Sequence, residues 1–187
     1  MARSLESTYR PLLEAVAFAA RAHRHQIRKD NVTPYASHPF RVCLIVRHIF
    51  GIDDPQALMA GVLHDTIEDT NTDYDDLEEH FGAEVAGWAA ALSKDKRRQE
   101  RPREKEYEAT LAGSGWQVQV CKLADIFDNL LDSNYLPPDK KVRAFERSDS
   151  YLQALHAHLH ERARPAWETT SRLLDELRAA AADGGGA

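Results

Sequence analysis

The chain has 187 residues, of which 43% are hydrophobic and 29% are charged, and its formal net charge is −6. These hydrophobic and charged fractions are typical of a globular protein, and the chain is long enough to bury a hydrophobic core. The negative charge argues against a broad basic surface for nucleic acid, although a bound metal and a few local Arg or Lys residues can still attract a small anionic substrate.

No targeting or membrane signal is present in the sequence. The first residues, MARSLESTYRPL, lack the basic and then apolar pattern of a signal segment, and no apolar run approaches the roughly 20 residues that span a bilayer. Cys43 and Cys121 lie in apolar runs and are expected to be reduced core thiols. We therefore expect a cytoplasmic protein without a membrane association.

Helical periodicity dominates the first half of the chain. Apolar residues recur at steps of three and four, which predicts amphipathic helices over residues 12–23, 38–50, 55–68, 73–82 and 83–93. The segment RKDNVTPYASHP, residues 28–39, carries two prolines and several turn formers, so it is predicted to be a loop.

The second half is also expected to be helical. Residues 94–106 form the most charged stretch and are predicted to be a solvated connection. A long helix is predicted over residues 116–131, with a brief valine alternation leaving a strand as the alternative. Pro137 and Pro138 open a final helical region, which Pro165 is expected to divide.

The segment GVLHDTIEDT is the most informative motif. If it is helical, His64 and Glu68 lie one turn apart on one face, as do Asp65 and Asp69. Imidazole nitrogen and carboxylate oxygen suit a divalent cation such as Mn²⁺, Fe²⁺, Zn²⁺ or Mg²⁺. Apolar neighbours predict burial, and buried ionisable groups are costly without a cation or mutual partners. The alternative is a buried hydrogen-bonded pair without metal.

Two further ligand candidates lie elsewhere in the sequence. His38 opens a helix directly after the predicted loop. Asp125 lies within VCKLADIFDNL, among apolar neighbours, where an unpaired carboxylate would be expensive and metal coordination would remove that cost.

Four motifs, in order AHRHQIRKDNVTPYASHP, GVLHDTIEDT, HFGAEVAG and KLADIFDNL, together resemble the HD hydrolase domain of the RelA/SpoT family, and most closely its stand-alone small alarmone hydrolases. An HD doublet alone would be weak, but four ordered motifs are specific. The resemblance implies an all-α HD-domain bundle with additional C-terminal helices. We accordingly expect an HD core over residues 1–135, C-terminal helices packing on it over 136–180, and a disordered tail over 181–187.

The resemblance also implies a reaction, the removal of pyrophosphate from the 3′ position of (p)ppGpp to give GDP or GTP. It implies these roles for matching residues: His38, His64, Asp65 and Asp125 as metal ligands, with Mn²⁺ the usual ion; Glu68 and Asp69 as the acidic pair that orients and deprotonates the attacking water; Arg28 and Lys29 as nucleotide contacts; and Asn129 as a ribose contact. The expected partner is therefore a small-molecule nucleotide, and neither nucleic acid nor a membrane.

Several positions depart from the family pattern. Asp30 and Asn31 follow the basic pair, as in the stand-alone type; Ile126 stands where Arg is common, Asp128 where His or Tyr is common, and SKDK where a Thr-Lys pair is common. These departures leave the metal ligands intact but leave the base and phosphate specificity open.

Other functions and simpler roles remain as alternatives. The substrate could be another nucleotide, such as ppApp, NADPH or a deoxynucleoside monophosphate, or the domain could be an inactive nucleotide-binding sensor. The Glu68–Asp69 pair argues against a sensor, because a binder needs no proton acceptor. Taken singly, the acidic pair and the Arg28–Lys29 pair could be solvated helix-end charges, and Asn129 could bond locally.

Overall fold

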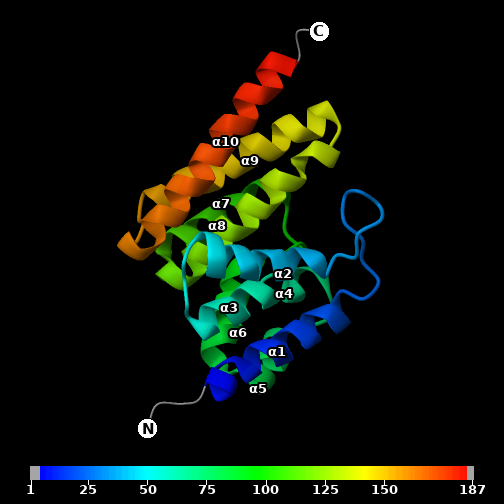
Figure 1. The fold of residues 1–187 in the computed structure, drawn as a ribbon, viewed down its shortest axis with the longest axis vertical. Helices are drawn as coiled ribbons and strands as arrows, with labels where there is room; N and C mark the ends of the chain where they lie inside the picture. Colours follow the sequence, from blue (N-terminus) through cyan, green and yellow to red (C-terminus); the bar gives the residue numbers. More distant parts are fainter. Residues whose placement is uncertain (1–4, 185–187) are drawn as a thin grey trace.

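The computed structural model describes residues 5–184 and shows a bundle of helices (Figure 1). Within that range no β-strand forms, and the one isolated bridge joins Ile27 to Pro34. The elements are α1 (Leu5–Ala22), α2 (Ser37–Leu44), the π-helix η1 (Ile45–Ile49), α3 (Pro55–Leu63), α4 (Thr66–Asp69), α5 (Tyr74–Phe81), α6 (Ala83–Leu92), α7 (Glu100–Gly113), α8 (Trp116–Leu131), the 3₁₀ turn η2 (Asp132–Tyr135), α9 (Pro138–His156), the 3₁₀ turn η3 (Glu161–Ala163) and α10 (Arg164–Gly184). The predicted all-α fold class is confirmed.

Helix α3 lies at the centre of the bundle. Its start is fixed by Asp54, whose carboxylate accepts a hydrogen bond from the backbone N–H of Ala57 at 2.9 Å, and by Pro55 in the first turn. The helix packs against α1, α2, α6 and α8, and every residue from Ala57 to Leu63 is buried. Because α3 is enclosed in this way, the residues that follow it emerge in the interior of the molecule.

Two hydrophobic clusters meet at α3. Leu63 belongs to the cluster formed with α1, α5 and α6, at the lower end of Figure 1, and Leu58 belongs to the larger cluster formed with α2, α8, α9 and α10. Leu123 of α8 and Leu174 of α10 are buried in the larger cluster. The polar site lies where α2, the end of α3 and α8 come together.

The helix expected over residues 55–68 is interrupted, which corrects the sequence prediction. Helix α3 ends at Leu63, and α4 begins at Thr66. His64 Nδ1 donates to the carbonyl of Gly61 at 2.8 Å, and Thr66 Oγ1 donates to the carbonyl of Leu63 at 2.7 Å. These side chains bond carbonyls at the end of α3, in competition with a continuous helix.

Other segments also differ from expectation. The charged stretch 94–106 is not entirely a connection, because α7 begins at Glu100 and buries Tyr107 and Leu111. The valine alternation before Asp125 lies in helix α8, so the strand alternative is wrong. Residues 181–184 continue α10, and the rest of the expected tail lies outside the described residues. No described helix is both long and apolar enough to cross a bilayer.

Candidate metal centre and catalytic site

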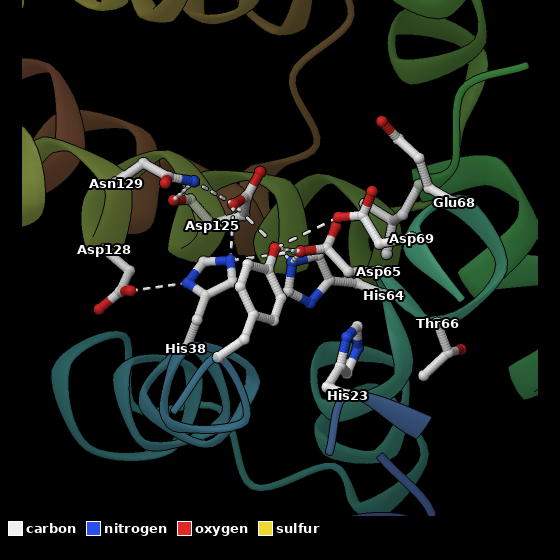
Figure 2. Close-up of polar contacts among 12 residues, drawn as sticks. His23, His38, His64, Asp65, Thr66, Glu68, Asp69, Asp125, Asp128 and Asn129 are labelled. Carbon is white, nitrogen blue, oxygen red and sulfur yellow. Dashed lines mark hydrogen bonds and ion pairs between the residues drawn. The ribbon is translucent and has the colours of Figure 1, made fainter. Parts of the chain in front are cut away.

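Four predicted metal ligands converge from three parts of the chain (Figure 2). His38 comes from α2, His64 and Asp65 from the turn between α3 and α4, and Asp125 from α8. Asp65 Oδ2 lies 3.1 Å from His64 Nε2 and 3.5 Å from His38 Nε2. Asp125 Oδ1 lies 3.2 Å from His38 Nε2 and 3.8 Å from His64 Nε2.

These separations fit one bound cation. Ligand atoms at about 2.1 Å from a metal lie about 3.0 Å apart at right angles and about 3.4 Å apart at the tetrahedral angle. The ligand atoms of His38, His64 and Asp65 all lie within 4.8 Å of one another. A mixed set of two imidazoles and two carboxylates suits a borderline-to-hard divalent ion.

Hydrogen bonds at the far side of each imidazole direct its lone pair toward the cluster. His64 Nδ1 lies 2.8 Å from the carbonyl oxygen of Gly61, which can only accept, so this nitrogen carries the proton. His38 Nδ1 lies 2.7 Å from Asp128 Oδ2. In both rings Nε2 is therefore left as the coordinating atom. His64 Nε2 is buried and makes no hydrogen bond of acceptable geometry, although Asp65 Oδ2 lies 3.1 Å away, and this fits an atom that coordinates a metal.

The electrostatics of the cluster favour charged groups. Burial alone would lower the pKa of His38, but the hydrogen bonds that its ring donates to Asp125, Asp128 and Asp65 raise that pKa to about 9. Burial would also lower the pKa of His64, but the neighbouring carboxylates of Asp65 and Asp125 raise it well above its usual value. Burial would raise the pKa of Asp125, but Lys122 and the imidazoles hold it well below its usual range. A metal must therefore displace protons from the imidazoles.

The predicted acidic pair lies beside these ligands, on the short helix α4. Glu68 Oε2 accepts a hydrogen bond from the backbone N–H of Lys94 at 2.9 Å, and Asp69 pairs with Lys96. Burial raises the pKa of Glu68, against the opposing charge of Lys94. Both carboxylates line the same cavity as Asp65. A carboxylate with a raised pKa in that place is suited to accept a proton from water.

Two supporting residues were missed by sequence reasoning. The hydroxyl of Tyr35 donates to Asp65 Oδ2 at 2.5 Å, and Lys122 Nζ donates to Asp125 Oδ2 at 2.8 Å. Lys122 therefore holds one oxygen of Asp125 while the other faces the imidazoles. A signal for Lys122 was present, because a buried acid in mid-helix needs a partner and a lysine three residues earlier lies on the same face.

The predicted substrate contacts separate into two groups. Lys29 Nζ donates to Asn129 Oδ1 at 3.1 Å, and both residues line the cavity. Arg28 is buried and does not line the cavity; its guanidinium pairs with Asp128 at 3.2 Å and with Asp132 at 2.5 Å. The remaining basic side chains of the lining are Lys94, Lys122 and Arg147, so the cavity contains cationic as well as acidic groups.

Comparison with known proteins gives consistent matches. A family model described as HD domain matches residues 15–150. The chain is 44% identical over 131 residues to guanosine-3′,5′-bis(diphosphate) 3′-pyrophosphohydrolase MESH1 of Homo sapiens, covering 68% of this chain and 72% of that protein. It is 36% identical over 141 residues to the Drosophila melanogaster protein of the same name, covering 75% and 78%. A solved structure of a metazoan SpoT ortholog, described as hydrolysing ppGpp, matches with a TM-score of 0.77 at 28% identity, covering 95% of this chain and 96% of that one.

Proposed function

This chain belongs to the HD-domain hydrolases of the RelA/SpoT family, and on that premise we propose that it removes the 3′-pyrophosphate from (p)ppGpp, giving GDP or GTP. The observation that carries this proposal is the convergence of His38, His64, Asp65 and Asp125, of which the two aspartates line one cavity together with the Glu68–Asp69 pair. We propose Mn²⁺ as the working ion and the cytoplasm as the place of action.

The cation supplies the electrophilic part of the chemistry: when bound, it polarises a phosphoryl oxygen and lowers the pKa of a nearby water. The chain supplies the rest. Glu68, with its raised pKa, accepts a proton from the water that attacks the phosphorus attached to the 3′-oxygen. The bond from that phosphorus to the 3′-oxygen breaks, and Glu68 returns the proton to the 3′-oxygen, which leaves as a hydroxyl. Asp69 orients the water. General-base catalysis of this kind typically contributes about 10²–10⁴-fold.

Lys29 and Asn129 are the proposed nucleotide contacts. Their mutual hydrogen bond at the cavity wall can be exchanged for bonds to a phosphate or a ribose hydroxyl. Arg147 and Lys94 add positive charge to the same wall and complement an anionic substrate. The contact of Arg28 with substrate stays a prediction, and in this structure its side chain is buried and paired with two aspartates.

A substrate panel tests the proposal. The purified protein is incubated with Mn²⁺ and, separately, ppGpp, ppApp, NADPH and dAMP, and the products are identified by chromatography. We expect pyrophosphate and GDP from ppGpp. Cleavage of NADPH or dAMP with ppGpp left intact would overturn the substrate assignment, and tight binding of a nucleotide without turnover would identify a sensor.

A further inference from the structure

Asp128 is fully buried on α8 and contacts the proposed metal ligand His38 on the side of the ring that faces away from the other ligands. Its Oδ2 lies 2.7 Å from His38 Nδ1, on the side of the ring opposite the coordinating nitrogen. Figure 2 shows Asp128 and Asp125 on the two sides of this imidazole. We propose that Asp128 is a positioning residue of the metal centre, which accepts the Nδ1 proton of His38, fixes the orientation of the ring and increases the basicity of Nε2.

A buried carboxylate in this place requires compensation, and the structure provides it. Asp128 Oδ1 lies 2.7 Å from Arg41 Nε, and Oδ2 lies 3.2 Å from a terminal nitrogen of Arg28. Asp132 bonds the same two arginines, at 3.0 Å and 2.5 Å. Two arginines and two aspartates sum to zero charge, so His38 need not be protonated to balance the network.

The two metal-binding imidazoles are thereby supported differently. His64 donates to the neutral carbonyl of Gly61, whereas His38 donates to a carboxylate. A hydrogen bond to an ionised acceptor is roughly twice as strong as a neutral one. A carboxylate behind a ligating imidazole also increases its donor strength toward the metal. Arg28 and Arg41 act on the metal centre through Asp128, which accounts for the burial of Arg28.

Asp132 offers a matched control for testing this inference, which rests on the metal site of the proposed function but not on its substrate. Asp128→Asn and Asp132→Asn each remove one negative charge from the same arginine pair, but only Asp128 contacts His38. The Mn²⁺ dissociation constant of each metal-stripped variant is measured by electron paramagnetic resonance, with circular dichroism to verify folding.

We expect Asp128→Asn to weaken Mn²⁺ binding by about 10–100-fold, and Asp132→Asn to change it by less than about threefold. Equal weakening by both variants would reduce Asp128 to a member of a structural network and overturn the inference, as would wild-type affinity in Asp128→Asn. Failure of ppGpp hydrolysis with this metal-affinity pattern intact would count against the proposed substrate alone.

A measurement on the wild-type chain covers the case in which Asp128→Asn fails to fold. In the Zn²⁺-loaded protein, nitrogen-15 NMR of the imidazoles should show a proton on Nδ1 of both His38 and His64. The Nδ1 proton of His38 should resonate further downfield, because its acceptor is charged. A His38 ring without an Nδ1 proton, or with one shifted less than that of His64, would contradict the inference.

Discussion

Protons and a cation compete for the same imidazole nitrogens in this centre. Two histidines with raised pKa values face two aspartates whose pKa values are held low, so the metal-free site is an ion-paired cluster. We therefore expect the protein to stay folded when the metal is removed, with a stability that depends on pH.

The sign of that dependence follows from His38. Its pKa rises from 6.5 in the unfolded chain to about 9 in the folded protein, so its contribution to stability is complete below pH 6.5 and is lost as the pH rises through about 9. We expect the urea midpoint of EDTA-treated protein to fall across this window, with His64 acting in the same direction. Mn²⁺-loaded protein is the control, and a metal-free midpoint that rises across the window would contradict the assignment.

We expect Glu68 and Asp69 to be required for turnover but not for binding of the metal. Glu68→Gln and Asp69→Asn should each lower kcat by about 10²-fold or more, because each removes a carboxylate from the water-activating pair. Bound Mn²⁺, measured by elemental analysis, should remain at the wild-type level. Glu79→Gln, an exposed change on α5, is the matched control and should leave kcat unchanged. Retained turnover in both site variants would remove these two residues from the mechanism.

Lys94 should tune the acid limb of the pH profile. Glu68 acts as a base only when ionised, so activity is lost as the pH falls through its pKa, which burial raises above 4.5 and Lys94 opposes. Lys94→Gln removes that opposing charge and should move the acid limb of kcat/KM to higher pH. Lys141→Gln, on α9, should leave the limb in place. An unmoved limb in the Lys94 variant would mean that another group sets it.

At the scale of elements, the break between α3 and α4 gives the site its shape. His64 follows the last residue of α3, and Glu68 and Asp69 lie on the separate helix α4, so that Asp65 and the acidic pair face one cavity. The N-terminal cap of α3 lies at the end of the helix away from the site, where it stabilises the fold.

The N-terminal cap of α3 should therefore affect stability without affecting chemistry. Asp54→Ala removes the hydrogen bond to the N–H of Ala57 and should cost about 1 kcal/mol. For a chain of this length the melting temperature should fall by about 2–4 °C. Glu79→Ala on the surface of α5 should have little effect, and kcat should be unchanged in both variants. A loss of activity at the assay temperature in folded Asp54→Ala would indicate coupling between cap and site.

Sequence reasoning predicted most helices and named four ligand candidates that the fold places close together, because apolar periodicity and the family motifs are local signals. It failed where local signals compete with tertiary contacts. Residues 100–106 were predicted to be a connection because they are highly charged, yet they form the start of α7. This helix buries only Tyr107 and Leu111. Asp128 was noted only as a departure from the family pattern, and its partner His38 lies 90 residues away. A buried Asp125 was expected to need a partner, because burying an unpaired acid is costly. On the same ground, a partner could have been predicted for Asp128 as well.

At the scale of the molecule, the C-terminal helices are continuous with the core. Helix α10 packs along α8, the helix that carries Asp125, and the larger hydrophobic cluster includes residues from both. The HD family match extends to residue 150, beyond the core boundary expected at residue 135. We propose that residues 136–180 fold together with the core as one cooperative unit.

A pair of leucine substitutions tests that unit. Leu174 of α10 is 2% exposed, and Leu174→Ala should destabilise the protein by about 2–5 kcal/mol, lowering the melting temperature by on the order of 10 °C. Leu131→Ala, at a site 42% exposed, should cost less than about 0.5 kcal/mol. Far-ultraviolet circular dichroism and tryptophan fluorescence should report one coincident transition. Two separate transitions would show that α10 unfolds independently.

The loop between α1 and α2 has a further consequence for how ligands enter. Arg28 fastens this loop to α8, while Lys29, the next residue, lies in the cavity wall. An outward movement of the loop would leave Asp128 and Asp132 with one arginine fewer. Breaking a buried ion pair costs about 3–5 kcal/mol, which makes such an open form rarer by about two to four orders of magnitude. We therefore expect the loop to stay closed in most molecules, which holds Lys29 beside Asn129 in the cavity wall before a nucleotide arrives.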